Sequence, residues 1–303
     1  MNDQRPPFLS GIRLRLSRIL RLSLTPVLML GLLLGMSAPA NAYTRGNVNT
    51  RPVILIHGLD PTGTAGFNCA DYWYGMRSQL NAQGWQGPIV TLGFYSGDTS
   101  CTQYASRTAT RDTSLNTLGK QVANWIYNTY SSKNIAVDVI AHSMGGLIIQ
   151  DAIEGAQEDK SGYPRTLYVE DVVTMATPHG GTTMSGLCPN TQCQQLAIGS
   201  SFIKNLRNNP QANGGTDWTN IGTERDQWVL PDSAVNWMDP SHKIFYPRSN
   251  PRVIDHHSII NWNAYSDWDY GWWNRGMPAW NNEWNGRSPN YRAFRAILRH
   301  SDT

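Results

Sequence analysis

The strongest constraint on the fold is a serine that follows an apolar run, in the segment Ile140-Ala-His-Ser-Met-Gly-Gly146. A serine hydroxyl is a weak nucleophile, and hydrolases that use one hold it on a sharp turn between a strand and a helix. Such a turn requires small residues two positions before and two after the serine, and Ala141 and Gly145 meet this requirement. The apolar residues 146–153 predict a mostly buried helix. We therefore predict that Ser143 is a nucleophile on a strand–turn–helix elbow rather than a simple helix N-cap.

Residues 1–42 have the pattern of an export signal. A segment with five arginines precedes an apolar stretch over residues 22–36, and Ala40-Asn41-Ala42 is a small-residue cleavage site. An uncleaved membrane anchor is the alternative, but the stretch contains Thr25 and Pro26 and is short for a span of about 20 residues. We expect cleavage after Ala42 and a secreted product, either extracellular or periplasmic.

The charge of the chain is concentrated in this leader. The whole chain carries +3, and the leader carries a net +4, so the remainder is close to −1. Basic residues in the remainder are scattered, which argues against a nucleic-acid partner. Residues 43–303 have the length of a single domain, for which a monomer is expected.

All four cysteines follow the leader, and an even number of cysteines in an exported chain implies disulfides. Three pairings are possible, and we favour Cys69 with Cys101 and Cys188 with Cys193. Each of these pairs closes a loop at one end of the expected sheet. A zinc site is the alternative, but there is no C-x-x-C pair and no histidine at zinc-site spacing.

Alternating apolar runs and amphipathic segments predict an α/β fold with a mostly parallel sheet and helices on both faces. The helix before the nucleophile is the clearest, because apolar residues recur at helical spacing from Leu115 to Ile126, after the capping candidates 112–114. A last helix is expected over residues 291–299. The predicted strands are residues 53–57, 89–94, 136–141, 172–176, 218–222 and 252–254.

The first of these strands ends in His57-Gly58. If the chain bends at Gly58, the backbone N–H of Leu59 can point at the same position as the N–H of Met144. Two such donors form an oxyanion hole, in which one donor contributes roughly 3 to 4 kcal/mol to transition-state binding.

Three segments together resemble secreted bacterial lipases and esterases of the α/β-hydrolase fold: Ile56-His-Gly58, Ala141-His-Ser-Met-Gly-Gly146 and Ala176-Thr-Pro-His-Gly-Gly181. Their order and spacing match over most of the chain after the leader. The resemblance implies an α/β-hydrolase fold and the chain order nucleophile, acid, histidine. We use this order to choose the partners of Ser143.

For the acid, the resemblance points to Asp226, which precedes a hydrophobic-valine-x-proline pattern; Glu224 and Asp232 are the nearby rivals. For the base, it points to His256, since two aliphatic residues follow at the matching distance; His257 is the alternative. We interpret His57, His142 and His179 as structural. No metal and no cofactor are expected.

Two segments lie outside the core pattern. Residues 182–215 form a possible cap or lid that contains the Cys188–Cys193 loop and an amphipathic stretch at 196–206. Residues 261–285 contain six tryptophans and form an excursion that is either a lid, a lipid- or sugar-facing surface, or packing under the last helix.

The expected function is hydrolysis of carboxylic esters, lipase-like on acylglycerols or other hydrophobic acyl esters, through an acyl-enzyme on Ser143. The substrate is expected to be an ester or lipid, with contact at a lipid–water interface. The alternatives are an acyltransferase, a polyester depolymerase or cutinase-like enzyme, and a non-catalytic lipid- or glycan-binding protein on the same fold.

Overall fold

The computed structural model describes residues 46–60, 66–263 and 266–299. The predicted export leader lies outside the described residues. Among the described residues, no helix has both the length and the apolar character needed to cross a membrane.

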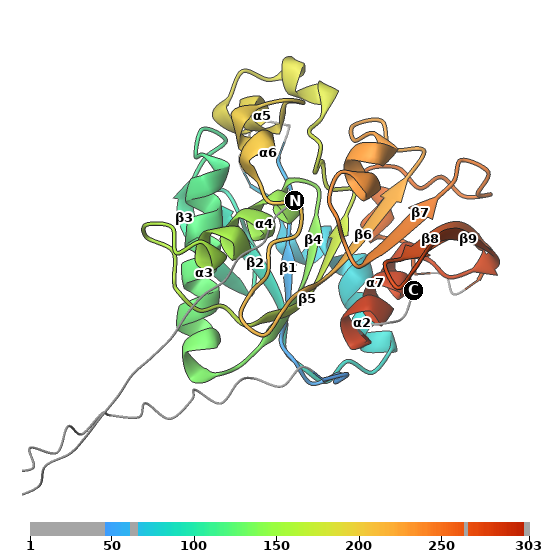
Figure 1. Cartoon of the computed structure of the whole chain (residues 1–303), viewed down its shortest axis with the longest axis horizontal. Helices are drawn as coiled ribbons and strands as arrows, with labels where there is room; N and C mark the ends of the chain where they lie inside the picture. Colours follow the sequence, from blue (N-terminus) through green and yellow to red (C-terminus); the bar gives the residue numbers. More distant parts are fainter. Residues whose placement is uncertain (1–45, 61–65, 264–265, 300–303) are drawn as a thin grey trace, which may run out of the picture. The chain divides into compact units, whose positions relative to one another are not determined.

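The described residues build a nine-stranded sheet with the strand order β3-β2-β1-β4-β5-β6-β7-β8-β9 (Figure 1). The neighbouring pairs from β3 to β7 are parallel, and β8 and β9 are antiparallel additions at one edge. This arrangement confirms the predicted α/β class. The strands are β1 (Val53–Ile56), β2 (Ile89–Tyr95), β3 (Gln103–Ala109), β4 (Val137–His142), β5 (Val169–Met175), β6 (Asp217–Thr223), β7 (His242–Tyr246), β8 (Trp268–Asn274) and β9 (Met277–Gly286).

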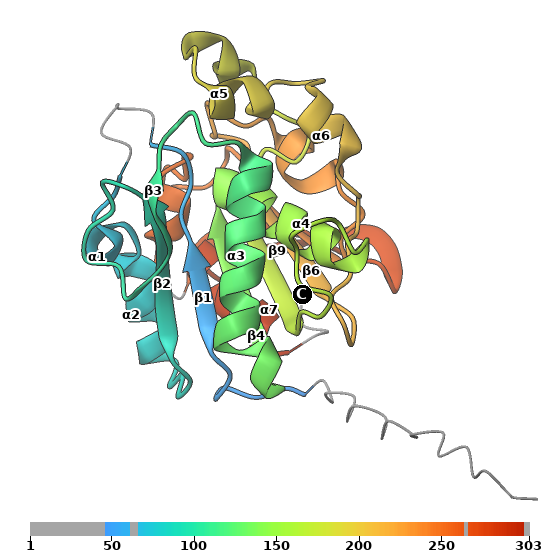
Figure 2. The same ribbon diagram turned by 90° about the vertical axis from the view of Figure 1, so that its left-hand side faces the viewer.

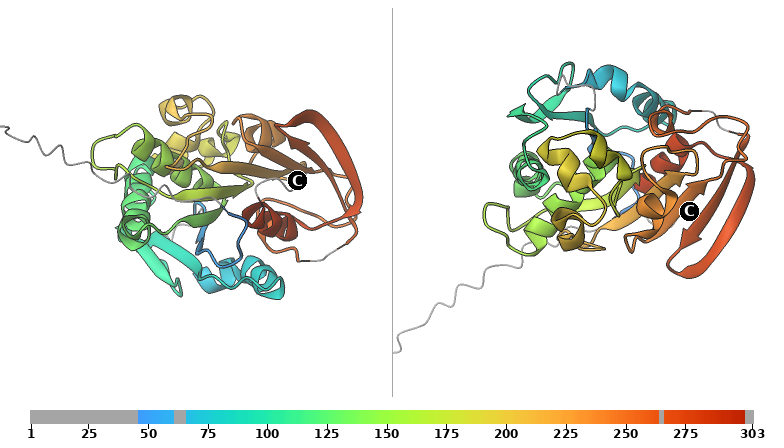
Figure 3. Two further views of the ribbon diagram at one scale, coloured as in Figure 1. Left: turned by 60° about the horizontal axis from the view of Figure 1, so that its bottom comes forward. Right: turned by 90° about the horizontal axis from the view of Figure 1, so that it is seen from above.

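Helices cover both faces of the sheet (Figures 2 and 3). Because side chains alternate along a strand, Ile54 and Ile56 pack in the core that contains α3 and α4. Val53 and Leu55 pack in the opposite core, which contains α2 and α7. The helices are α1 (Cys69–Tyr72), α2 (Tyr74–Ala82), α3 (Leu115–Thr129), α4 (Met144–Gln157), α5 (Thr191–Leu196), α6 (Ser201–Asn205) and α7 (Pro289–Leu298), with single turns at Ser131–Lys133, Thr183–Leu187, Asp232–Asn236 and Ser258–Ile260.

The sequence patterns near Ser143 predicted the correct helix and strands. The helix before it is α3, whose N-cap is Ser114, with its Oγ accepting from the Thr117 N–H at 3.2 Å. The strands predicted at 53–57, 89–94, 136–141, 172–176 and 218–222 correspond to β1, β2, β4, β5 and β6. Each of these strands is almost wholly buried, and buried strands of a parallel sheet are rich in apolar residues.

The prediction of a strand at residues 252–254 is wrong. These residues form a loop, in which Ile254 is buried and Val253 is half exposed. The position beside β6 is occupied instead by β7, whose alternating buried and partly exposed residues were not recognised. The polar strand β3 was also missed, because Ala109 is its only buried residue.

The tryptophan-rich run is largely a β-hairpin. β8 pairs with β7 and β9 pairs with β8, so the run extends the sheet at its edge. Trp268 at the start of β8 is fully buried, whereas Trp280 and Trp284 on β9 are exposed. The hypothesis that these residues pack under the last helix therefore holds only for part of the run.

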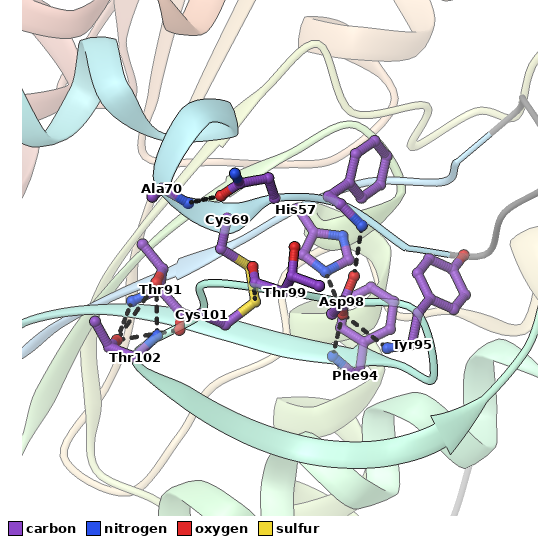
Figure 4. Close-up of a disulfide and its surroundings, with 12 residues drawn as sticks. His57, Cys69, Ala70, Thr91, Phe94, Tyr95, Asp98, Thr99, Cys101 and Thr102 are labelled. Carbon is purple, nitrogen blue, oxygen red and sulfur yellow. Dashed lines mark hydrogen bonds and ion pairs between the residues drawn. A yellow bond between two sulfur atoms is a disulfide. The ribbon is translucent and has the colours of Figure 1, made fainter.

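Two disulfides join the pairs favoured from the sequence, Cys69–Cys101 and Cys188–Cys193. The first ties the start of α1 to the connection between β2 and β3 (Figure 4). The second joins Cys188, which precedes α5, to Cys193 within α5, five residues later. All four cysteines are therefore in disulfides, and none is left as a thiolate ligand for the alternative zinc site.

Candidate active site

Ser143 lies on a strained turn between β4 and α4. Its φ of 54° is in the left-handed region that L-residues rarely adopt, and such strain is retained where surrounding structure enforces it. The turn is crowded. A Cβ added to Gly145 would lie 2.4 Å from the Ile56 carbonyl oxygen, and one added to Gly58 would lie 2.7 Å from Ser143 Cβ. The two glycines thus allow the end of β1 to pass directly beside the serine.

The structure brings Ser143, His256 and Asp226 together, although they come from three separate loops. His256 Nε2 is 2.9 Å from Ser143 Oγ, and His256 Nδ1 is 2.8 Å from Asp226 Oδ2. Because a carboxylate only accepts, the Nδ1 proton of His256 is directed at Asp226, which leaves Nε2 free to accept from the serine hydroxyl. The side chains of His256 and Asp226 are each 2% exposed, whereas Ser143 is partly accessible.

The position of Asp226 is set by its own backbone neighbours. Its Oδ1 accepts hydrogen bonds from the N–H groups of Trp228 and Val229, at 2.8 and 2.9 Å. These bonds occupy one carboxylate oxygen and leave the other for His256. The Asp226 carboxylate is therefore held in a fixed position, as the carboxylate of an aspartate that orients an imidazole must be.

The rival residues lie elsewhere. The ring of His257 packs edge-on against Trp228, with centroids 4.5 Å apart, and does not reach Ser143. Glu224 accepts from the Arg248 N–H and Asp232 from the Asn236 amide. In the described part of the chain, no group of three or more potential metal ligands is found.

A series of hydrogen bonds that was not predicted from the sequence leads to the backbone of His256. His142 Nε2 contacts the His256 carbonyl oxygen at 2.7 Å, so this nitrogen donates. His142 Nδ1 then accepts from the Tyr72 hydroxyl at 2.5 Å, and that hydroxyl accepts from the Gly58 N–H at 3.2 Å. Burial lowers the pKa of His142 well below its ordinary value and raises that of Tyr72, so both groups stay neutral. This series of hydrogen bonds joins the loop after β1 to the loop that carries His256.

The other two motif histidines are structural, as interpreted from the sequence. His57 stacks on Phe94 and contacts the Gly58 carbonyl and the Asp98 carboxylate, both at 3.0 Å (Figure 4). Burial alone would raise the pKa of Asp98, but the hydrogen bond with His57 and backbone N–H donors hold it below its usual value. His179 bridges Thr174 and Gln150, and burial lowers its pKa to about 3.

The two expected oxyanion donors flank the serine. Met144 is the first residue of α4, directly after Ser143. Leu59 follows the Gly58 bend and lines the same cavity as Ser143 and His256. Both residues therefore lie near the serine, and their role as oxyanion donors stays a prediction.

A mostly apolar cavity of about 220 Å³ opens beside Ser143. Trp228 and Val229 form one wall, and the predicted cap segment contributes Thr182, Met184 and Leu196. The Cys188–Cys193 disulfide also lines it. A cavity of about 330 Å³ elsewhere is lined by Asp151, Glu154 and Lys160, but these groups already pair with one another or with Tyr163.

The chain is similar to known lipases. A family model described as lipase (class 2) matches residues 50–260. A triacylglycerol lipase of Burkholderia plantarii is 30% identical over 155 residues, which cover 50% of this chain and 36% of that protein. A triacylglycerol lipase of Pseudarthrobacter phenanthrenivorans is 31% identical over 134 residues, covering 43% of this chain and 34% of that protein. The matched stretch thus spans about a third of each of these two relatives.

Among solved structures, the mature form of a Bacillus licheniformis lipase is similar with a TM-score of 0.47 and 16% identity. The similarity covers 70% of this chain and 87% of that one.

Proposed function

The chain belongs to the class 2 lipase family, and from this premise we propose that it is a secreted serine hydrolase that cleaves carboxylic esters of hydrophobic acyl groups. The observation that carries the proposal is the 2.9 Å contact between Ser143 Oγ and His256 Nε2 at the wall of an apolar cavity. Asp226 behind His256 completes the arrangement that acyl transfer through a serine requires.

In the proposed mechanism, His256 Nε2 takes the proton of Ser143 as Oγ attacks the ester carbonyl carbon. The negative charge that develops on the carbonyl oxygen is stabilised by the N–H groups of Leu59 and Met144. The imidazolium, stabilised by Asp226, then protonates the departing alcohol, and the acyl group remains on Ser143. Water repeats the sequence and releases the acid.

The surroundings of the cavity favour a hydrophobic substrate. Ile198, Leu230 and Trp237 are each about half exposed, at 52%, 55% and 51%. Ile198 and Leu230 are close in sequence to the cavity residues Leu196 and Val229, and Trp237 lies over Gly180. Exposed apolar groups gathered at a binding site indicate an interaction surface. We propose that they contact the lipid–water interface.

The two disulfides support export to an oxidising compartment. We accordingly propose that residues 1–42 are a cleaved leader and that residues 43–303 act as one domain. The segment 182–215, which contributes to the cavity wall, is proposed to act as its cap.

The direct test is hydrolysis of p-nitrophenyl esters with increasing acyl length, together with an emulsified triacylglycerol. We expect hydrolysis across the series, because the cavity wall beside Ser143 is mostly apolar. Activity on the emulsion would support the lipase assignment, and activity restricted to short soluble esters would support a carboxylesterase. Negligible rates on every ester would contradict the proposal. Product analysis with added alcohol distinguishes hydrolysis from acyl transfer.

Tyr72→Phe is expected to lower kcat by roughly tenfold. The substitution leaves the Gly58 N–H and His142 Nδ1 without their shared partner, and the loss of such bonds costs about 1 to 3 kcal/mol. Because the hydroxyl does not touch the cavity, KM should change little. Steady-state kinetics of the variant check this, with Tyr74→Phe as the matched control, since Tyr74 is 72% exposed. Equal kcat values for Tyr72→Phe and the unmodified protein would contradict a positioning role.

A further inference from the structure

The β8–β9 hairpin carries a surface that the proposed ester hydrolysis does not use. It forms the edge of the sheet (Figure 1), and β9 is exposed along nearly its whole length. Trp280 is 47% and Trp284 is 67% exposed. Tryptophan is seldom left in solvent in this way, because its ring has a large apolar area. Two such rings on one strand therefore indicate a binding surface.

The exposed rings border a cavity of about 230 Å³. Trp280, Asn282 and Trp284 on β9 all line this cavity, near a register shift in the pairing of β8 with β9. Gly271 on β8 lies under the ring of Trp280, and a Cβ there would be 3.3 Å from Trp280 Cε3. The missing side chain at Gly271 leaves room beside that ring. Phe245, Tyr270 and Pro247 complete the apolar part of the lining.

Polar groups lie beside the rings. Asp269, Asn282 and Glu283 line the same cavity. Asp269 Oδ1 accepts from the Asn285 N–H at 3.1 Å, whereas the side chains of Asn282 and Glu283 make no hydrogen bond within the described residues. Their amide and carboxylate groups are thus available to a ligand that brings several hydroxyl donors and acceptors.

From this combination we propose that the hairpin binds a neutral, extended polysaccharide of the β-1,4-linked type. The flat C–H faces of the sugar rings stack on Trp280 and Trp284, and hydroxyl groups bond to Asn282, Glu283 and Asp269. The two tryptophans are four residues apart, which is at most roughly 13 Å along the backbone of β9, whose pairing with β8 shifts register near Trp284. That separation fits a straight chain with flat, exposed ring faces better than a single sugar or a coiled α-linked chain.

The lining argues against other occupants. No lysine or arginine lines the cavity, and two carboxylates do, so anionic lipids and acidic glycans are electrostatically disfavoured. Aliphatic side chains, which insert between lipid tails, are also missing from the lining, apart from Pro247. The cavity shares no residue with the one beside Ser143. The site is therefore a separate one that would hold the protein on a polysaccharide surface while esters are cleaved elsewhere on the molecule.

The test is retention of the protein on microcrystalline cellulose and on chitin, with starch and anionic phosphatidylglycerol vesicles as comparison probes. The Ser143→Ala protein is used, so that binding is measured without hydrolysis and does not depend on the proposed function. We expect saturable binding to at least one of the two β-1,4-linked polymers. Adding Trp284→Ala should weaken the affinity at least tenfold, and adding Trp280→Ala should weaken it further.

Tyr74→Ala is the matched control, because Tyr74 is an exposed aromatic residue on α2, outside the hairpin. It should bind as well as its parent. A thermal unfolding curve for each variant excludes loss of the hairpin fold as the cause. Absence of binding to both β-1,4-linked polymers, equal binding by the Trp284→Ala protein, or adsorption to the vesicles alone would each overturn the proposal.

Discussion

Replacing Ser143 by alanine is expected to lower kcat for a p-nitrophenyl ester by about 10⁶-fold. The substitution removes the attacking oxygen, and loss of a serine nucleophile has an effect of this size in a serine hydrolase. A residual rate above that in water would remain, from the oxyanion donors and substrate binding alone. The measurement is steady-state hydrolysis at enzyme concentrations high enough to detect the residual rate.

The stability of the Ser143→Ala protein provides the control. Within the described part of the chain, the Ser143 side chain hydrogen-bonds to His256 alone, and alanine retains the Cβ that packs beside Gly58. The melting temperature should therefore change little. A variant that keeps activity within tenfold of the unmodified protein would show that Ser143 is not the nucleophile, whatever its geometry.

His256→Ala and His257→Ala form a matched pair with opposite expected outcomes. Removal of His256 deprives Ser143 of its base and should lower kcat about 10⁶-fold, close to the loss of the serine itself, because the two act as a unit. His257 contacts Trp228 and not Ser143, so its removal should change kcat by no more than a few-fold. Parallel kinetics and unfolding curves of the two variants measure the difference.

Asp226→Asn extends the same comparison. The amide would retain most of the size of the carboxylate but would favour the wrong tautomer of His256, for which a loss of about 10⁴-fold is expected. Glu224→Gln is its control, since Glu224 pairs with Arg248 at the surface. A larger effect from His257→Ala or Glu224→Gln than from its partner variant would mean that the proposed base or acid is misassigned.

The fold was predictable wherever a strand is buried on both faces. β1, β2, β4, β5 and β6 are almost wholly buried, and α3 has a single apolar face with a serine cap. The edge strands were not predictable in this way. β3 and β9 each have a single buried residue, so their sequences lack the apolar pattern that marks a core strand, and pairing with a neighbour is what keeps them extended.

In the tryptophan-rich run, the tertiary structure decides which tryptophans are buried and which are exposed. Trp268 is buried against Tyr246 and Trp262, while Trp284 is left in solvent. Both belong to one run of irregularly spaced aromatic and polar residues, and nothing in the composition separates them. The difference in burial between Trp268 and Trp284 depends on which strand of the hairpin lies nearer the core.

The elbow at Ser143 follows from the residues around it alone. Its signature is the small residue at position 145, and the structure gives the steric reason, since a Cβ there would meet the Ile56 carbonyl oxygen of β1 at 2.4 Å. The family pattern also indicated Asp226 and His256. Only the tertiary structure shows that His256 contacts Ser143 and that His257 packs on Trp228, because this depends on the course of the loop after β7. The tertiary structure also brings together Tyr72 and His142, which are 70 residues apart and share a hydrogen bond. No sequence pattern records such a contact, since it depends on where β1, α1 and β4 end in space.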